Sequence, residues 1–425
     1  MKKNVLIYPS GAGNAIEIYY SIKDSIHINV IPASGKVDLS ELVYENEVEY
    51  IPYIQSANFI DELNELIERK KIDYIFPTHD TVALHLVENS KTINSHIISS
   101  NYKTNYICRY KEETYNVFKD TDFCPKVYTE IVSEDQYPIF AKPNVGEGSK
   151  GVQLVKNSSQ HSALKNTHKD LLFVEYLPGK EYTIDCFTNR NGELQFAGPR
   201  ERVEIMMGVS FRSKQVKDTK RFLQIANQIN NQLELRGLWF FQLKEDVNNE
   251  LKLLEVSTRT PGTIGFFRHL GVNLPLLSVF DAMELDVNIE MSDFDIELFR
   301  ATRNKYNYSF SYKRVYLDFD DTLIINNKVN LDVISFVYQC NNLGKPVHLI
   351  TKHDSDLSET LKKYNIQESL FDSIILLKHE EKKSDFINPD QAIFIDNWFK
   401  EREEVKNSLN IPVFDVDTVN SLIIQ

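Results

Sequence analysis

The stretch from Tyr137 to Gly151, Tyr-Pro-Ile-Phe-Ala-Lys-Pro-Asn-Val-Gly-Glu-Gly-Ser-Lys-Gly, places a short apolar strand directly before a glycine-rich loop. The strand brings Lys142 to its end, and Pro143 stops the hydrogen-bond ladder. Glycine permits close backbone approach, so the loop can lay its N–H groups against phosphate oxygens, and Lys142 adds a positive charge for them. A hairpin with a glycine-rich turn and a surface lysine is an equally good interpretation of this stretch taken alone.

The composition limits the class of protein. A chain of 425 residues has room for roughly three domains. Its net charge of −13 argues against a nucleic-acid partner, and no apolar run approaches the about 18 residues of a membrane span. The four cysteines show no C-x-x-C spacing, which fits a reducing compartment. We therefore expect a cytoplasmic protein without nucleic-acid or membrane partners.

The first hundred residues alternate predicted strands and helices, which favours a parallel sheet with ligands at the carboxyl ends of its strands. The segment Ser10-Gly11-Ala12-Gly13-Asn14 is half of a dinucleotide-binding fingerprint, because Ile16 stands at the third glycine position. Thr78 or Asp80 is expected to cap the helix after the fourth strand. The expected strands are 4–9, 27–31, 49–52 and 74–77, and the expected helices are 59–70 and 101–119.

A second group of polar residues falls on two later strands, expected at 238–243 and 250–256. Alternation puts Glu255, Ser257 and Arg259 on one face, and Gln242 can lie across from them. A small number of oxygen ligands suits Mg²⁺, which shares phosphate oxygens and keeps waters. The alternative is a solvated hairpin face with a Glu–Arg pair, and this is favoured when the strands are considered alone.

Taken in order along residues 1–290, these features resemble the ATP-grasp superfamily, and in particular the carbamoyl phosphate synthetase large subunit and related carboxylate–amine ligases. The resemblance implies a Rossmann-like pre-ATP-grasp subdomain at 1–100 and an ATP-binding domain of two α+β subdomains at 101–300. It also implies the site residues: Lys142 at the α- and β-phosphates of ATP; Gly146, Glu147, Gly148, Ser149 and Gly151 in a loop over them; Glu175, Tyr176 and Leu177 at the adenine; Glu181 at the ribose; Gln242, Glu255 and Ser257 at Mg²⁺, or alternatively Mn²⁺; and Arg259 at the transferring phosphate or acyl phosphate.

The superfamily usually has asparagine where Ser257 stands, which implies weaker binding of a second metal ion. Residues 301–313 are polar, aromatic and basic without helical period, and we interpret them as a linker rather than a nucleic-acid contact.

The last part of the chain begins with an apolar strand that ends in paired carboxylates, Arg314-Val-Tyr-Leu-Asp318-Phe-Asp320-Asp-Thr322. A phosphate ligand would lie at such a strand end. Two further strands follow, one ending at Thr351 and one ending at Asp396-Asn397. Between them, Lys378, Lys382 and Lys383 are candidate lysines before a helix, and Lys383 is preferred because it directly precedes the helical Ser-Asp-Phe-Ile.

This order resembles the haloacid dehalogenase superfamily and implies a small capless Rossmannoid phosphatase domain at 314–425. The resemblance makes Asp318 the nucleophile and Asp320 the general acid and base. Thr351 and Lys383 would hold the phosphoryl group, and Asp318, the carbonyl of Asp320, and Asp396 would ligate Mg²⁺. Asn397 replaces a second aspartate that is common in the superfamily.

The expected protein is thus an α/β bifunctional enzyme. One site would join a carboxylate to an amine through an acyl phosphate made from MgATP, and the other would hydrolyse a phosphorylated small molecule. An ATP-grasp kinase acting on a hydroxyl, and a nucleotide-binding regulatory module with a vestigial ligase site, remain alternatives. The sequence leaves the substrates and the oligomeric state open.

Overall fold

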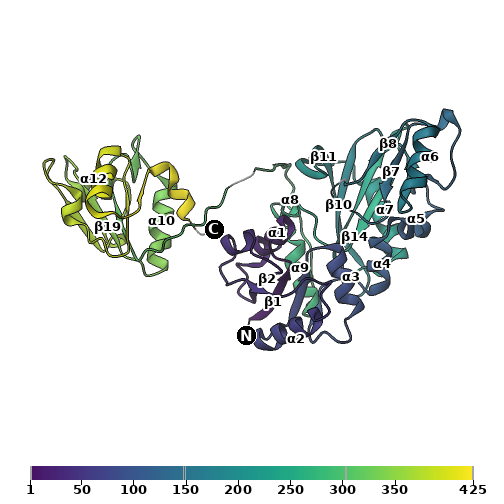
Figure 1. Ribbon diagram of the computed structural model, residues 1–425, viewed down its shortest axis with the longest axis horizontal. Coiled ribbons are helices and arrows are strands. Elements are labelled where there is room, and N and C mark those ends of the chain that lie inside the picture. Colours follow the sequence, from purple (N-terminus) through teal and green to yellow (C-terminus); the bar gives the residue numbers. More distant parts are fainter. Residues whose placement is uncertain (1, 147, 149, 302–303, 424–425) are drawn as a thin grey trace. The chain divides into compact units, whose positions relative to one another are not determined.

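A computed structural model describes residues 2–146, 148, 150–301 and 304–423. The chain divides into two compact units, residues 1–302 and residues 303–425. Each unit has its own sheets (Figure 1). The buried hydrophobic clusters of the two units share no residue. No helix in the described part of the chain is both long and apolar enough to cross a lipid bilayer.

The first sheet of the first unit is parallel throughout, as its strand–helix alternation predicts. Its strand order is β3-β2-β1-β4-β5, with β2 and β3 on one side of β1 and β4 and β5 on the other. The strand order therefore reverses between β1 and β4. Ligands of such sheets bind beyond the carboxyl ends of the strands at the reversal. The elements are β1 (Lys3–Tyr8), α1 (Gly13–Ile22), β2 (Ile28–Ser34), η1 (Leu39–Leu42), β3 (Glu49–Tyr50), α2 (Phe59–Lys70), β4 (Tyr74–Pro77), α3 (Asp80–Glu88) and β5 (His96–Ile97).

The cap of α3 differs from the expectation. The Nδ1 atom of His79 accepts the Thr81 N–H at 3.2 Å, so His79 is the N-cap rather than Thr78 or Asp80. The Thr78 hydroxyl donates instead to the carbonyl of Pro9 at 2.7 Å. Asp80 is left available for a distant partner, described below.

The expected helix 101–119 is two helices, α4 (Tyr102–Arg109) and α5 (Lys111–Phe118). Tyr110 between them is extended, with φ −103° and ψ 112°. The N–H groups of Lys111 and Glu112 at the start of α5 donate to the backbone and side-chain oxygens of Asn144, which follows Pro143. The break therefore fastens α5 to the beginning of the glycine-rich loop.

Two antiparallel sheets complete the first unit. The smaller has the order β6-β9-β7-β8, and the larger has the order β14-β13-β10-β11-β12-β15. Their elements are β6 (Val127–Tyr128), η2 (Glu134–Gln136), β7 (Ile139–Pro143), β8 (Gln153–Val155), α6 (Ser158–Thr167), β9 (Leu171–Glu175), β10 (Glu181–Thr188), β11 (Leu194–Met206), β12 (Val209–Gln215), α7 (Lys220–Gln232), β13 (Gly237–Glu245), β14 (Leu251–Ser257), α8 (Gly265–Arg268), α9 (Leu274–Ala282) and β15 (Glu297–Phe299).

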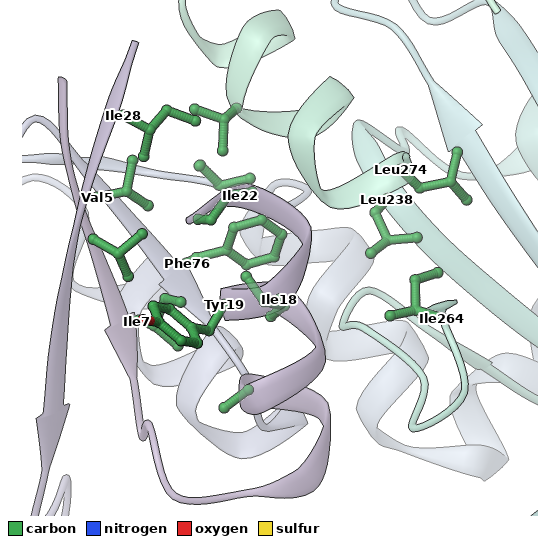
Figure 2. Packing of buried hydrophobic residues seen from close by; sticks show 14 of the residues in the cluster. Val5, Ile7, Ile18, Tyr19, Ile22, Ile28, Phe76, Leu238, Ile264 and Leu274 are labelled. Atoms are coloured by element: carbon green, nitrogen blue, oxygen red, sulfur yellow. The ribbon is translucent and has the colours of Figure 1, made fainter. Parts of the chain in front are cut away.

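A single hydrophobic core joins the parallel sheet to the larger antiparallel sheet. Helix α1 lies between β1 and the segments that carry Leu238, Ile264 and Leu274 (Figure 2). Val5 of β1 and Ile18 of α1 belong to the same buried cluster. This shared core fixes the carboxyl ends of β1 and β4 relative to the strands of the antiparallel sheet.

The second unit is a five-stranded parallel sheet of order β20-β19-β16-β21-β22 with helices on both faces. Val315 and Leu317 of β16 pack with α10, whereas Tyr316 of the same strand packs with α12. The elements are β16 (Arg314–Leu317), β17 (Ile324–Ile325), β18 (Lys328–Val329), α10 (Leu331–Asn342), β19 (Val347–Thr351), α11 (Leu357–Lys363), η3 (Glu368–Leu370), β20 (Ser373–Leu376), η4 (Lys383–Phe386), β21 (Ala392–Ile395), α12 (Phe399–Leu409), β22 (Val413–Phe414) and η5 (Val416–Leu422).

The segment interpreted as a linker has no regular secondary structure in its described part, but much of it packs on the second unit. Tyr308, Phe310 and Tyr312 lie against the core cluster that contains Phe336 and Phe414. The alternating aromatic residues of this segment are thereby explained as packing residues.

Candidate functional sites

A cavity of about 550 Å³ lies in the first unit, where the three sheets converge. Its walls come from the loop after β1, the end of β4, strands β7, β9, β10, β11, β13 and β14, and the segment after β14. The cavity collects most of the residues singled out from the sequence. These are Lys142, Gly146, Gly148, Glu175, Tyr176, Leu177, Glu181, Gln242, Glu255 and Arg259.

Lys142 is a buried lysine at the end of β7, only 6% exposed. Its Nζ atom donates to the hydroxyl of Tyr115 and, at 3.2 Å, to the carbonyl of Leu254. Burial is the main cause that lowers its pKa to about 7, and the charge of Lys111 acts in the same direction, while Glu255 opposes it. This ammonium therefore lacks the counter-charge that a phosphate group would supply.

The glycine-rich loop has a backbone conformation that only glycine adopts easily. Gly148 and Gly151 have φ of +61° and +74°, and Lys111 Nζ donates to the carbonyl of Gly146 at 3.0 Å. Gly151 is not among the residues that line the cavity. The predicted loop residues Glu147 and Ser149 lie outside the described residues.

The turn between β11 and β12 touches this loop. A Cβ atom built on Gly208 would lie 2.5 Å from the carbonyl carbon of Gly148, and the φ of Gly208 is +76°. Both the positive φ and the close contact with Gly148 therefore require glycine at position 208.

We expect Gly208→Ala to weaken ATP binding at least tenfold, because the new methyl group must push the turn away from the loop. The matched control is Gly192→Ala, since Gly192 has a similar φ of +81° but nothing within 4 Å of the added Cβ. Calorimetric titration of ATP into both variants separates steric contact from backbone strain. Equal ATP affinity in the two variants would remove the turn from the site.

The residues expected at the adenine and ribose lie at the ends of β9 and β10. The Glu175 carboxylate accepts the backbone N–H of Lys126 at 2.8 Å. Glu181 forms an ion pair with Arg202 and a second one with Lys244 at 3.4 Å. Arg202 is not among the site residues expected from the sequence, although an arginine in an otherwise apolar and acidic stretch is a recognisable signal.

Gln242 and Glu255 are directly paired across β13 and β14, and both line the cavity. Arg202 Nη1 donates to the Gln242 side-chain oxygen at 3.1 Å. Within the described part of the chain, no group of three His, Cys, Asp or Glu residues is arranged to hold a metal ion. Glu255 supplies a carboxylate and Gln242 an amide oxygen, and two such oxygens fit a Mg²⁺ ion that takes its remaining ligands from phosphate and water.

Ser257 is placed differently from the expectation. It does not line the cavity, and its hydroxyl donates to Asp80 Oδ1 at 2.6 Å. Asp80 also pairs with Arg259 Nε at 2.7 Å. Burial would raise the pKa of Asp80, but the Arg259 guanidinium and the hydrogen bonds from Ser257 and Arg259 lower it to about 2. Asp80 thus stays negatively charged and holds the Arg259 guanidinium in place, and the hydrogen bond from Ser257 stabilises the Asp80 carboxylate.

The second unit has a separate cluster at the carboxyl ends of β16 and β21. Lys383 Nζ donates to Asp318 Oδ1 and to Asp396 Oδ2, both at 2.6 Å, and all three residues are buried. Thr322 Oγ1 donates to the other oxygen of Asp318 at 3.2 Å, and the Asn397 N–H donates to Thr322 Oγ1 at 3.1 Å. The residues expected at the nucleophile, the lysine and the metal carboxylate are therefore together.

Burial is the main cause that raises the pKa of Asp318 to about 6; Lys383 opposes this shift and Asp396 adds to it. Burial also raises the pKa of Asp396. In the structure the Lys383 ammonium bridges these two buried carboxylates, and Mg²⁺ ligation by Asp318, Asp396 and the Asp320 carbonyl stays a prediction.

Asp320 and Thr351 complete this cluster less directly. The side chain of Asp320 is half exposed, and its Oδ2 lies 2.8 Å from His353 Nδ1. Thr351 is buried at the end of β19, next to β16 in the sheet. Sequence reasoning missed His353, which lies two residues after Thr351 and had no motif to mark it.

Comparison with known structures shows the fold over 67–69% of the chain. The biotin carboxylase domain of 2-oxoglutarate carboxylase from Hydrogenobacter thermophilus, solved with MgADP, ADP and bicarbonate, is 15% identical with a TM-score of 0.56, over 69% of this chain and 71% of that one. N5-carboxyaminoimidazole synthetase from Staphylococcus aureus, solved with ADP, is 16% identical with a TM-score of 0.56, over 68% and 81%. An L-amino acid ligase from Bacillus licheniformis is 15% identical with a TM-score of 0.53, over 67% and 74%.

The mixed α/β ATP-grasp fold expected from the sequence is thereby confirmed. Within it, residues 167–299 match a family model described as an ATP-grasp in the biosynthetic pathway with Ter operon. No curated protein matches the chain. The expected haloacid dehalogenase-like domain at 314–425 lies beyond the family match and stays a prediction.

Proposed function

We propose that the first unit is a MgATP-dependent ligase that activates a carboxylate as an acyl phosphate and joins it to an amine. The observation that carries the proposal is the convergence of Lys142, the Gln242–Glu255 pair and Arg259 on one cavity. The solved structures of similar fold with ADP or MgADP support a nucleotide there. One protein of similar fold is an L-amino acid ligase, which supports the reaction class.

In this mechanism each residue acts through its charge or its hydrogen-bonding atoms. Lys142 and Lys111 neutralise the phosphates, and Gln242 and Glu255 hold Mg²⁺, which would draw charge from the oxygens of the transferring phosphoryl group. Arg259, kept in place by Asp80, faces the negative charge that develops as the carboxylate oxygen attacks phosphorus. The bond from this phosphorus to ADP breaks as the acyl phosphate forms. The amine then attacks the acyl carbon, and the phosphate leaves with the proton that the amine nitrogen loses.

We further propose that the second unit is a phosphatase with a haloacid dehalogenase-like fold. Asp318 attacks the phosphorus of a monoester, and the ester oxygen leaves with a proton from Asp320. Water, deprotonated by Asp320, then attacks the phosphoaspartate and releases phosphate. The support is the cluster of Asp318, Lys383 and Asp396, in which Lys383 can hold a phosphoryl oxygen.

Two assays of the full chain test the proposal. The first measures ADP and phosphate release with MgATP over a panel of carboxylates combined with amines. Amine-dependent ADP release supports a ligase, whereas ADP release that needs only a hydroxyl compound would show a kinase instead. The second measures phosphate release from an aryl phosphate with Mg²⁺ and with chelator, and hydrolysis that survives chelation contradicts the proposed phosphatase chemistry.

Lys142 provides a pH test of the ATP site. A triphosphate next to the ammonium raises its pKa from about 7, so ATP binding should take up a proton above pH 7. The affinity should be highest below pH 7 and fall as the pH rises, by up to about tenfold per pH unit. Calorimetry at pH 8 in two buffers of different ionisation enthalpy, with saturating Mg²⁺, measures the proton uptake.

In the same titrations at pH 8, Lys142→Ala should lose the proton uptake. In a separate titration at pH 6, the variant should lose about 2 kcal/mol of ATP binding free energy. Equal affinity in the wild type and the variant would contradict the assignment of Lys142 to the phosphates.

A further inference from the structure

The cavity of the first unit is strongly cationic although the chain is acidic overall. Among the residues that the structure describes, eight lysine and arginine side chains line it and three carboxylates do. Four of these cations have carboxylate partners. Arg200 pairs with buried Asp185, Arg202 and Lys244 pair with Glu181, and Arg259 pairs with Asp80.

Arg300 is different from these paired arginines. It follows β15, and its backbone N–H donates to the carbonyl of Phe211 at 2.7 Å, which fixes where the side chain begins. Its Nη2 atom donates to the carbonyl of Gly262 at 2.7 Å. Among the residues that the structure describes, no carboxylate lies within ion-pair distance of its guanidinium.

The guanidinium of Arg300 lies between two loops that approach it as bare backbone. A Cβ atom on Gly13 would lie 3.6 Å from Nη2, and one on Gly262 would lie 3.6 Å from Nη1. Asn14 ties these loops together, because its Nδ2 donates to the carbonyls of Thr78 at 2.6 Å and Thr260 at 3.1 Å. The arginine is thus held at a built position in the cavity wall.

Among the described residues, the groups placed against the Arg300 guanidinium are uncharged: the backbone of Gly13, and the backbone of Gly262, whose carbonyl accepts its hydrogen bond. Arginine has five N–H donors in a planar fork that matches carboxylate and phosphate oxygens. A guanidinium in the cavity wall that has no ion pair among the described residues can therefore receive an anion.

Resting on the proposed ligase function, we propose that Arg300 binds an anionic group, a carboxylate or a phosphate, of the amine substrate. The group is separate from the reacting atoms and from the triphosphate. Arg259 is then left for the acyl phosphate, and Arg300 selects anionic amines over neutral ones. Arg300 is therefore a specificity-determining residue.

The first test measures binding without turnover. The full chain is saturated with Mg²⁺ and a non-hydrolysable ATP analogue, and succinate and inorganic phosphate are each titrated in by calorimetry. Arg300→Gln should weaken at least one of these anions tenfold or more, and the anion affected tells carboxylate from phosphate. Phosphate bound by the second unit does not respond to this substitution and so cancels in the comparison.

The matched control is Arg212→Gln. Arg212 lies on neighbouring β12 and pairs with Glu297, but it does not line the cavity. Unchanged affinity for both anions in Arg300→Gln overturns the inference. If the wild type does not bind the ATP analogue, the proposed ligase fails, and the same titrations without nucleotide still decide the role of Arg300.

The second test uses turnover with pairs of amines that differ only in charge, such as an amino acid and its carboxamide. Arg300→Gln should raise the KM of the anionic member at least tenfold with a smaller change in kcat, and Arg300→Lys should restore part of the loss. The KM of the carboxamide should not change. Equal effects on both members of the pair would make Arg300 a structural residue only.

Discussion

Replacement of Glu255 by glutamine should reduce ADP formation by about two orders of magnitude or more, since phosphoryl transfer depends on the charge that a metal ligand contributes. Glu255 faces Gln242 across β13 and β14 at the cavity wall. Glutamine keeps the shape and one oxygen, so the substitution removes charge with little change in packing. The measurement is ADP release with MgATP and an accepted pair of carboxylate and amine.

The control for this experiment is Glu250→Gln, the same change at an exposed residue just before β14. That variant should turn over like the wild type, and both variants should have the far-UV circular dichroism of the wild type. If Glu255→Gln keeps turnover within a factor of a few, Glu255 does not hold the catalytic Mg²⁺.

Asp318→Asn should abolish phosphomonoester hydrolysis, because an amide cannot attack phosphorus. Asp320→Asn should leave a slow reaction, since general acid–base help contributes about 10²–10⁴ in rate. The assay is Mg²⁺-dependent phosphate release from an aryl phosphate by the full chain. Asp332→Asn, at an exposed residue in the first turn of α10, is the control and should be fully active.

Hydrolysis that survives Asp318→Asn would overturn the nucleophile assignment. The same variant should bind ATP with unchanged affinity, because the clusters of Asp318 and Lys142 lie in different compact units and the described residues give them no shared partner. A parallel loss of ligase activity would show that the two sites depend on one another.

Residue positions that depend on local pattern could be predicted from the sequence. Lys142 ends an apolar strand before glycines, and the period of two in the later strands brings Glu255 opposite Gln242. In the second unit, Asp318 and Asp396 both end buried strands, so a parallel sheet places them at one edge.

Residues whose role depends on distant partners could not be predicted. Asp80 and Arg259 are 179 positions apart, and their ion pair exists only because one core joins the parallel and antiparallel sheets. Nothing local distinguishes Asp80 from an ordinary helix cap. The break at Tyr110 has the same origin, because Asn144 in another element supplies the acceptors for the first turn of α5.

The core that Val5, Ile18, Leu238 and Leu274 share has a consequence for modularity. An ATP-binding region cut out at residues 101–300 would leave the partners of Leu238 and Leu274 behind and expose apolar side chains to water. The piece that can be inherited, duplicated or fused as a whole is therefore the entire first unit. In this chain the second unit begins after residue 302, so it is attached without interrupting that core.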